Sequence, residues 1–451
     1  MLERINKFFR QKTIRGKAAS GDVVASDEHT LTPEMMSVDA LKVVRTLQKA
    51  GFQAYVVGGC VRDLLLGLKP KDFDVATNAE PDQVKSLFRR ARIIGRRFQI
   101  VHVQFNREII EVTTFRSNQQ GKNSNGTRRQ TDSGMLTRDN VFGTLSDDAS
   151  RRDLTINALY YDPIDNSLRD FADGLNDIKK RVVRIMGDPA TRFREDPVRL
   201  LRVVRFAAKL GFRIESKTAE PMRRLADNLQ LVSAPRFFDE SLKLFMSGQG
   251  LATYQLLDDY RFFDYIVPEL SSCLQQDPLA AALIEQAFTN TDLRIRSLKR
   301  VTPAFIYAAL LWPIVAQRAT EYREQGESPL SAQRRAADNA IFSQVVVTAI
   351  PKRFSIPMRE IWDLQLSLPR RGGVRAERLI GHPRFRAAYD FVLLREESGE
   401  DLEGLGDWWT RYQDSDAQQR LEMASAIKEP GSSRTRRRRP RKPKNSAKNV
   451  D

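Results

Sequence analysis

Cysteine and histidine are both scarce in this sequence. Its 451 residues include two cysteines and three histidines, and neither residue type occurs at the close spacing that forms a zinc site. A catalytic pair of one cysteine and one histidine stays open on composition alone. If the protein binds a metal, carboxylates must supply the ligands, and carboxylate ligands favour Mg²⁺ or Mn²⁺.

Long apolar runs are also missing. No stretch of about 18 uncharged apolar residues occurs in the chain, so no transmembrane segment is predicted. Residues 1–20, MLERINKFFRQKTIRGKAAS, are basic but lack the apolar core and the small-residue cleavage site of a signal peptide. The sequence therefore predicts a cytoplasmic protein.

Acidic residues are outnumbered by basic ones. Lysine and arginine total 74 against 57 aspartates and glutamates, which gives a formal net charge of +17. A chain this basic usually binds a polyanion, either a nucleic acid or an anionic membrane surface. Solubility alone is the alternative, but the charge is clustered. Residues 434–448, RTRRRRPRKPKNSAK, are rich in Lys and Arg and contain no acid, which predicts a disordered basic arm.

The sequence patterns divide the chain into a mixed head and an all-α rear. Between 37 and about 115, helical and strand patterns alternate, which predicts an α+β head with a small mixed β-sheet. From about 188 onward, amphipathic helical patterns predict all-α neck and body domains. A polar segment at 117–140 has no period, so we expect a mobile loop near a site there. The predicted parts are a basic N-terminal extension (1–36), the mixed head (37–187), a helical neck (188–250), a helical body (251–425) and the basic arm (426–451).

Two aspartates share one predicted strand of the head. In KDFDVAT (71–77), Asp72 and Asp74 stand two residues apart, a spacing that puts strand side chains on one face. Neighbouring carboxylates repel each other, and a divalent cation relieves that repulsion. A pair of surface aspartates in a turn is the alternative. Glu111 in EIIEVTTF alternates with apolar residues on another predicted strand, either as a third ligand or as an exposed side chain.

A glycine pair precedes these aspartates. In VVGGCVRD, Gly58 and Gly59 end a predicted strand and begin a short helix that contains Arg62. Glycines at such a turn let backbone N–H groups approach a phosphate, and the helix N-terminus favours an anion. A tight turn is the alternative for a lone glycine pair. Combined with the carboxylate pair one short helix away, the turn indicates an anion site beside a metal site.

The order of the motifs resembles a known family. GGCVRDLLLG, KDFDVAT, IEVTTFR, RRDLTINALYYD (151–162) and REDPVRLLRVVRFAAKLGF (194–212) follow one another as in the template-independent nucleotidyltransferases, which include class II tRNA CCA-adding enzymes and bacterial poly(A) polymerases. The segment IIGRRFQIVHV (93–103) and the basic extensions resemble the polymerases rather than the CCA-adding enzymes.

The resemblance implies a role for the first motifs. Gly58, Gly59 and Arg62 would hold the triphosphate of the nucleotide. Asp72 and Asp74 would ligate two Mg²⁺ ions. The implied reaction is attack of an RNA 3′-hydroxyl on the α-phosphorus of ATP, with release of pyrophosphate.

The later motifs are implied to recognise the nucleotide. If residues 151–160 are helical, Asp153 and Asn157 share a face toward the ribose, with Arg152 near a phosphate. Asp153 is also counted among the family's essential carboxylates, so the third catalytic carboxylate is either Asp153 or Glu111. Without the resemblance, Asp153 reads as a helix N-cap.

A second recognition motif lies in the predicted neck. Glu195, Asp196 and Arg199 match the motif whose side chains read the Watson–Crick edge of the base, so protein side chains would select the nucleotide without a template. Asp196 also precedes Pro197, which predicts that Asp196 caps a helix.

We therefore predict a poly(A) polymerase that adds AMP from ATP to RNA 3′ ends and promotes RNA decay. A CCA-adding enzyme is the first alternative, because it shares every catalytic residue named above. A non-catalytic RNA-binding scaffold is the second, although intact catalytic carboxylates argue against it. RNA-decay proteins as partners and a monomeric state are further expectations.

Deleting residues 434–451 is expected to weaken RNA binding most at low salt, because the basic arm would neutralise phosphates and salt screens that attraction. Mobility shift of a labelled RNA across a salt series measures the effect. Equal low-salt affinity of the deleted and full-length chains would show that the arm only aids solubility.

Overall fold

The computed structural model describes residues 21–95, 99–106, 108–117, 128–130, 136–139 and 141–427. The basic arm at 434–448 and the first 20 residues of the N-terminal extension lie outside them. The chain forms two compact units. The first contains residues 1–276, 287–306 and 341–351, and the second contains residues 277–286, 307–340 and 352–451. The five predicted parts do not map onto this division and stay a prediction.

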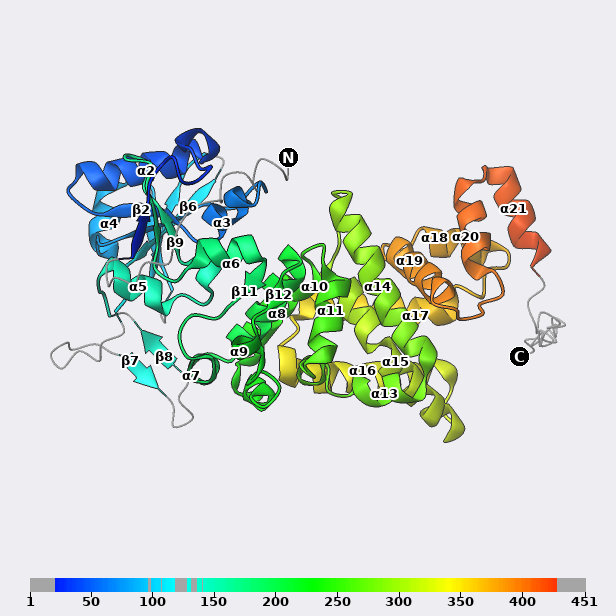
Figure 1. Ribbon diagram of the computed structural model, residues 1–451. Helices are drawn as coiled ribbons and strands as arrows, with labels where there is room; N and C mark the ends of the chain where they lie inside the picture. Colours follow the sequence, from blue (N-terminus) through cyan, green and yellow to red (C-terminus); the bar gives the residue numbers. More distant parts are fainter. Residues whose placement is uncertain are drawn as a thin grey trace, which may run out of the picture. The chain divides into compact units, whose positions relative to one another are not determined.

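A mixed β-sheet of eight strands forms the centre of the head (Figure 1). β3 and β6 pair in parallel, whereas the other neighbouring strands pair antiparallel. The mixed sheet followed by helices confirms the predicted fold class. In spatial order the strands are β1 (Asp22–Val24), β10 (Leu168–Asp170), β9 (Leu159–Tyr161), β2 (Ala54–Val57), β3 (Asp74–Thr77), β6 (Ile109–Thr114), β5 (Ile100–Gln104) and β4 (Ala91–Ile94).

The two faces of the sheet are covered differently. On one face, α2 (Val38–Lys49), α3 (Gly59–Leu65) and α4 (Pro81–Leu87) pack on an apolar core that includes Val75 and Val112. On the other face, α5 (Leu145–Arg151) packs beside Ala76. Because strand side chains alternate, Asp74 and Glu111 point to the α5 face. The sheet thus separates the candidate site from the main core of the head.

Local signals explain where the head helices begin and end. The Ser37 hydroxyl caps α2 by accepting the N–H groups of Asp39 and Ala40. Gly51 follows α2 with a φ of +88°, a conformation that glycine adopts without steric cost. Pro81 is the first residue of α4, where its missing N–H removes no helix bond. These features confirm the helices predicted there.

Two local predictions are wrong. The strand β3 begins at Asp74, so Asp72 lies in the preceding turn and strand alternation does not orient it. Residues 151–160 do not form one helix, because the Asp153 carboxylate accepts the N–H of Leu154 and competes with helical bonding. Only a 3₁₀ turn, η2 (Thr155–Asn157), follows α5.

Two further differences concern the boundaries of irregular segments. β1 pairs with β10, so part of the predicted N-terminal extension belongs to the sheet. Within the segment predicted as a loop, β7 (Arg128–Gln130) and β8 (Leu136–Asp139) pair antiparallel. Most of the loop's other residues lie outside the described part of the chain.

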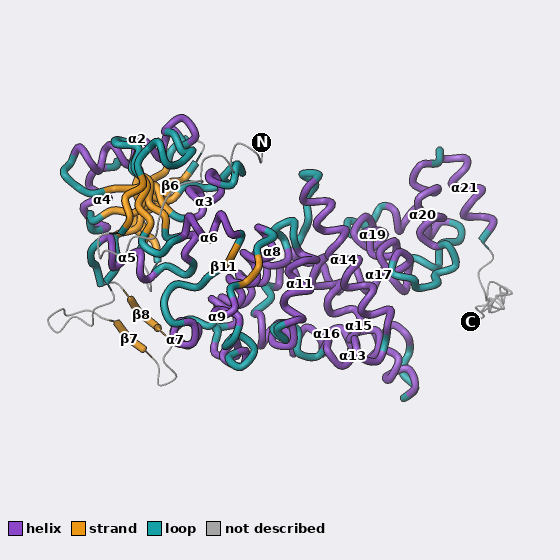
Figure 2. The backbone as a smooth tube through the Cα atoms, viewed as in Figure 1, coloured by secondary structure: helices purple, strands orange, loops and turns teal. Residues whose placement is uncertain are grey.

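The first unit continues from the head into helices (Figure 2). β11 (Val182–Val183) pairs in parallel with β12 (Arg213–Ile214), a short strand inside the region predicted to be all-α. The helices of this part are α6 (Gly174–Lys180), α7 (Pro189–Glu195), α8 (Val198–Leu210), α9 (Ser216–Ala219), α10 (Ala234–Phe245), α11 (Gly250–Asp259), α12 (Phe263–Ile266) and α13 (Leu270–Gln276), with 3₁₀ turns η1 (Pro33–Met35) and η3 (Ala226–Leu231).

The second unit is helical throughout its described residues. Trp409 and Tyr412 lie at the centre of an apolar cluster, with Trp408 stacked on Tyr412 at 4.8 Å between ring centroids. All four tryptophans of the chain are buried, so they pack the core. The remaining helices, three of which contribute to both units, are α14 (Pro278–Arg296), α15 (Pro303–Glu324), α16 (Pro329–Thr348), α17 (Lys352–Ser367), α18 (Val374–Ile380), α19 (Phe385–Glu397), α20 (Leu405–Asp414) and α21 (Ala417–Ala426).

No helix in the described ranges combines the length and the apolar character that a membrane crossing requires.

Gly174→Ala is expected to destabilise the protein by about 1–3 kcal/mol, because overpacking forces the surrounding backbone to shift. A Cβ at Gly174, the first residue of α6, would lie 2.4 Å from the Thr155 carbonyl oxygen in η2. Gly381→Ala is the matched control, since its Cβ would meet no atom closer than 3.6 Å. Urea unfolding of both variants measures the difference, and equal midpoints would contradict the close contact between α6 and η2.

Candidate active site

Asp74 and Glu111 lie side by side at the start of the parallel pair β3–β6. They are register partners, and paired residues of neighbouring strands project from the same face. Asp72 is exposed in the turn before β3 and is close enough for its charge to act on Asp74. The structure thus brings together three of the predicted catalytic carboxylates.

The surroundings of Asp74 disfavour its ionised, negatively charged form. Burial, together with the charges of Glu111 and Asp72, raises the pKa of Asp74 to about 6. Arg152 acts in the opposite direction. A bound cation would stabilise the ionised form of Asp74, so the acidic cluster has the electrostatic character of a cation site.

The donor set of the cluster fits Mg²⁺. This ion prefers carboxylate oxygens and is commonly held by one or two carboxylates together with substrate phosphates. Among the residues that the structure describes, no three His, Cys, Asp or Glu side chains form a ready-made metal site. Asp72 and Asp74 would therefore share a metal with the phosphates of a bound nucleotide. The Nε2 atom of His102, on β5, lies 3.3 Å from Oε1 of Glu111 and helps to fix that carboxylate.

The glycine turn lies beside these carboxylates. Val57, the last residue of β2, is the register partner of Asp74, and Gly58 follows directly. Gly58 has φ +83° and ψ −129°, a conformation that only glycine adopts readily. A Cβ there would lie 3.2 Å from Nη1 of Arg152, whereas at Gly59 the nearest atom would be 3.5 Å away. The strict requirement for glycine is therefore at Gly58.

Arg152 lies between the glycine turn and the carboxylates. Its Nε donates to the Tyr160 hydroxyl at 2.8 Å, and its Nη2 is 3.2 Å from Oδ2 of Asp148. The Tyr160 hydroxyl donates to that same oxygen at 2.7 Å. Asp148 and Tyr160 were not singled out by the sequence, although Asp148 stands four residues before Arg152. They hold the guanidinium where its charge reaches Asp74, which favours the predicted phosphate contact.

Arg62 is buried and makes several polar contacts within the protein. Its side chain is 2% exposed, its Nε and Nη2 donate to Oδ1 of Asp63, and its Nη1 donates to Oδ1 of Asn157. The ring of Phe206 lies 4.8 Å from the guanidinium carbon. In this arrangement Arg62 holds the side chains of Asp63 and Asn157 in place. Its contact with a triphosphate stays a prediction.

The negative charge of Asp153 is compensated by neighbouring groups of the protein. Its carboxylate forms an ion pair with Arg202 on α8 at 2.5 Å and accepts the amide N–H of Asn157 at 3.1 Å. Burial alone would raise the pKa of Asp153, but Arg202 and the hydrogen bonds hold it well below its usual range. Asp153 and Asn157 therefore meet as predicted, without a helix. The contrast with Asp74 favours Glu111 over Asp153 as the third metal ligand.

Glu195 and Arg199 of the predicted base-reading motif lie together. Oε2 of Glu195 accepts Nη1 of Arg199 at 3.1 Å and Nη1 of Arg192 at 2.9 Å. Arg192 also donates from Nη2 to the backbone carbonyls of Arg151 and Arg152, at 2.6 and 2.7 Å. Arg192, which the sequence did not reveal, thus connects this motif to the segment that carries Arg152.

Asp196 does not cap α8 as predicted. Its Oδ2 accepts Nη2 of Arg236 at 2.7 Å, and α8 begins at Val198 after Pro197. The ion pair uses the carboxylate that a helix cap would need, so the capping prediction is wrong. The role of Asp196 in base reading stays a prediction.

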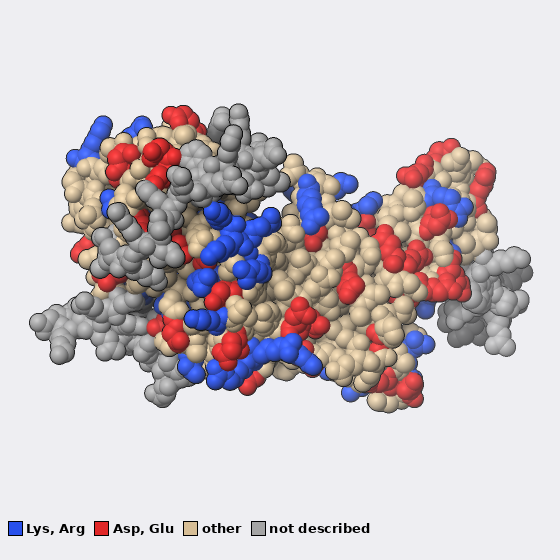
Figure 3. Space-filling view, in the orientation of Figure 1, with Lys and Arg blue, Asp and Glu red and all other residues tan. Residues whose placement is uncertain are grey.

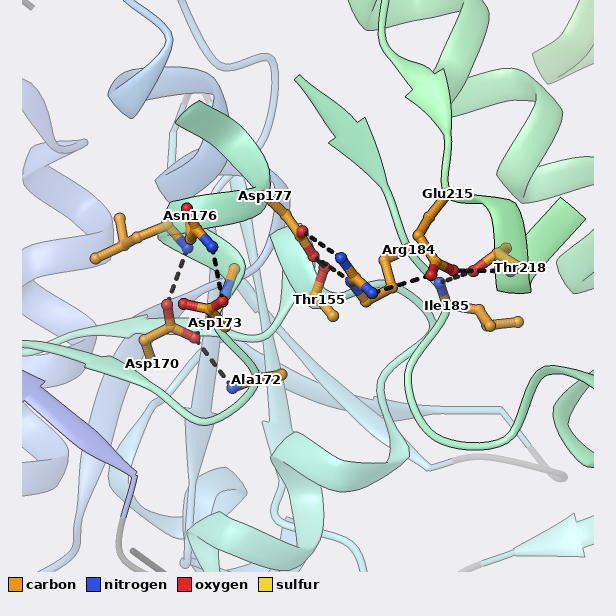
Figure 4. Close-up of polar contacts among 12 residues, drawn as sticks. Thr155, Asp170, Ala172, Asp173, Asn176, Asp177, Arg184, Ile185, Glu215 and Thr218 are labelled. Carbon is orange, nitrogen blue, oxygen red and sulfur yellow. Dashed lines mark hydrogen bonds and ion pairs between the residues drawn. The ribbon is translucent and has the colours of Figure 1, made fainter. Parts of the chain in front are cut away.

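A chain of polar contacts connects η2 to the start of α9 (Figure 4). Asp177 accepts the Thr155 hydroxyl at 2.6 Å and the Nε of Arg184 at 3.0 Å. Arg184 then reaches Glu215 at 3.2 Å, and Glu215 accepts the Thr218 hydroxyl at 2.9 Å. Thr155 lies 22 residues from Asp177, and Arg184 and Glu215 are also distant in the sequence, so spacing gave no signal for these two contacts. They fix η2, and with it Asn157, against the neck.

The head, its site and the helices define a nucleotidyltransferase with a helical body. Three family models match the chain in order: "Poly A polymerase head domain" at 54–184, "Probable RNA and SrmB- binding site of polymerase A" at 211–274, and "Polymerase A arginine-rich C-terminus" at 325–443. The chain is 44% identical to poly(A) polymerase I of Salmonella typhi over 98% of both chains. The chain belongs to the poly(A) polymerase I family.

Two further similarities extend to the CCA-adding enzymes. The CCA-adding enzyme of Bacillus velezensis is 38% identical over 74% of this chain and 83% of its own. The crystal structure of the Bacillus stearothermophilus CCA-adding enzyme with CTP superposes with a TM-score of 0.57 and 25% identity, over 84% of this chain and 82% of its own. The two groups therefore share the fold, and the higher identity lies with the polymerases.

Asp74→Asn is expected to stabilise the Mg²⁺-free protein at about pH 8 and much less at about pH 4. Ionised Asp74 is repelled by Glu111, and its pKa is raised from 3.8 to about 6. A raised carboxyl pKa means that stability is lost as the pH rises through this interval, and the amide removes that loss. Thermal melting in EDTA at the two pH values measures the effect.

Asp72→Asn is the control for this measurement, because Asp72 is exposed and its replacement should change the melting temperature little. Identical melting of wild type and Asp74→Asn at the higher pH would contradict the raised pKa of Asp74, which burial and the neighbouring Glu111 cause.

Proposed function

We propose that the protein is an ATP:RNA adenylyltransferase that extends RNA 3′ ends with AMP, without a template, and releases pyrophosphate. The observation that carries this proposal is the 44% identity to poly(A) polymerase I over 98% of both chains. The glycine turn beside the carboxylates gives the activity a site with the required chemistry.

Metal binding is assigned to the acidic cluster. Asp72 and Asp74 would hold two Mg²⁺ ions, which when bound would activate the attacking oxygen and stabilise the leaving one. Glu111 is the third carboxylate of the site, because it is the register partner of Asp74, whereas Asp153 is engaged by Arg202. The neighbouring His102 keeps Glu111 in place from β5.

The remaining residues bind and orient the nucleotide. The backbone at Gly58 and Gly59 approaches the triphosphate, and Arg152 supplies positive charge to it. Asn157, fixed by Arg62 and Asp153, faces the ribose. Phosphoryl transfer of this kind depends mainly on positioning and on neutralising phosphate charge, so these contacts account for most of the protein's contribution.

Base selection is assigned to the neck. Glu195, Asp196 and Arg199 would present donors and acceptors to the edge of adenine. Each of the three has an arginine contact that limits the orientations of its side chain: Glu195 with Arg199, Asp196 with Arg236, and Arg199 with the backbone carbonyl of Arg192 at 3.2 Å. A fixed pattern of donors and acceptors can reject a base that lacks the complementary groups.

RNA is the second substrate. The match of residues 211–274 to an RNA-binding segment of polymerase A supports this assignment, as does the net charge of +17. Promotion of RNA decay, RNA-decay proteins as partners, a monomeric state and a cytoplasmic location are further parts of the proposal that rest on the family resemblance.

A primer-extension assay tests the proposed activity. Purified protein, Mg²⁺ and a labelled RNA are incubated with each nucleoside triphosphate singly. We expect long ladders with ATP alone. Addition of only a few C and A residues to tRNA ends would instead identify a CCA-adding enzyme. No incorporation by a protein that still shifts RNA on a gel would identify a non-catalytic scaffold.

Asp72→Ala is expected to abolish incorporation and leave RNA affinity nearly unchanged, and Glu111→Gln to lower kcat at least about 100-fold. Asp82→Asn on α4, also an exposed aspartate of the head, is the matched control and should retain full activity. Substantial activity of Asp72→Ala would overturn the metal assignment. Full activity of Glu111→Gln would favour Asp153 as the third catalytic carboxylate.

A further inference from the structure

A strongly basic surface lies outside the site described so far. Figure 3 shows Lys and Arg side chains gathered over the region where Figure 1 labels α6, β11 and α8. Five exposed basic residues belong to these elements and the residues that follow them: Lys179, Lys180, Arg181, Lys209 and Arg213. We call these five residues the β11–β12 basic patch.

The backbone brings the members of the patch together. Lys180 ends α6, and Arg181 follows with a left-handed φ of 54° that turns the chain into β11. The N–H of Arg213 donates to the carbonyl of Arg181 at 3.1 Å, through the parallel pairing of β11 and β12. The guanidinium of Arg181 lies 5.6 Å from the ring centroid of Phe212, next to Arg213.

Helix stability explains only part of this charge. Cations in the last turn of a helix interact favourably with its C-terminus, each by about 0.3–1 kcal/mol, which accounts for Lys179, Lys180 and Lys209. Arg181 and Arg213 lie outside the helices. In the described part of the chain, Lys180, Arg181 and Arg213 make no ion pair. Folding does not require this excess of positive charge, which suits a polyanionic ligand.

The patch is continuous with the catalytic site at one edge. Nζ of Lys209 lies 3.2 Å from Oδ2 of Asp63, and the other oxygen of Asp63 accepts two bonds from Arg62. Arg62 in turn holds Asn157. At the other edge, Arg213 falls within the segment matched to RNA binding, residues 211–274. The patch therefore lies between the nucleotide site and that segment.

We propose that the β11–β12 basic patch binds backbone phosphates of the RNA strand upstream of its 3′ end. This inference rests on the proposed function, because it takes RNA as the substrate that must reach Asp74. The chemistry is that of lysine and arginine with a single-stranded phosphate backbone, so binding at the patch is independent of base sequence and sensitive to salt. The C-terminal end of head helix α6 thereby becomes part of the RNA path.

A triple variant, Lys180→Gln with Arg181→Asn and Arg213→Gln, tests the patch in the full-length protein. Asparagine tolerates the left-handed conformation at 181. The matched control is Lys49→Gln with Lys85→Gln and Arg89→Gln, which also removes three exposed charges. Lys49 is on α2, Lys85 is on α4, and Arg89 is in the turn after α4. Circular dichroism and thermal melting establish that both triples are folded.

The readout is the affinity for a labelled oligoadenylate, measured by fluorescence anisotropy over a salt series. For single strands each lost phosphate contact lowers the slope of log K against log salt by about 0.7, so the patch triple should lower it by about 2 and weaken low-salt binding about tenfold or more. The control triple should change the slope little. The KM for ATP should stay unchanged, and the KM for RNA should rise only for primers long enough to reach the patch.

Equal salt slopes for the patch and control triples would overturn the proposal and leave the patch as a surface for an acidic protein or as general charge. Failure of the proposed function gives a different result. If the wild-type protein does not incorporate AMP but its RNA binding still depends on the patch, the polymerase assignment is wrong. The same result would support the RNA path.

Discussion

The ion pair between Arg202 and Asp153 is the constraint on which the arrangement of head and neck depends. A series of polar contacts runs from Arg202 to Asp153 and on through Asn157, Arg62 and Asp63 to Lys209. Helix α8 carries both ends of this series and so closes it into a ring. Arg202 and Lys209 are both on α8, so the ring attaches that helix to the head at two places about two turns apart. A buried pair adds little net stability over apolar packing, but losing one partner leaves an uncompensated charge. The ring therefore specifies one position for α8.

The neighbouring charges also distinguish the carboxylates of Asp153 and Asp74. Asp153 has its own cation and keeps its charge, which lowers its pKa. Asp74 has another acid beside it, and its pKa rises. The charge of Asp153 is compensated within the protein, whereas the charge of Asp74 is not. In the proposed function, this acidic cluster of a basic protein is where metal ions would bring two anionic substrates together, RNA and nucleotide.

Much of this could be predicted from sequence where the signal is local. The Gly58 turn and the alternation of helices and strands between 37 and about 115 were both predictable from periodicity and from the glycine pair. Asp72 was misplaced because strand propensity does not show where a strand begins. The 3₁₀ turn at 155–157 was missed because a side chain of Asp153 competes with the helix. Arg192, Asp177 and Arg202 were not predicted, since each makes a contact that joins the head to a segment 22 or more residues away in the chain.

These long-range contacts bear on the proposed selection of the nucleotide. Arg192 joins Glu195 of the neck to the backbone at Arg152 of the head, so the groups that would read the base and those that would bind phosphate form one connected structure. A template-independent enzyme needs such a connection, because base choice must come from side chains held at a fixed distance from the reacting phosphate. The CCA-adding relatives share the fold, so we expect a difference in base choice to lie in the proposed reading residues and the arginine contacts that orient them rather than in the catalytic carboxylates.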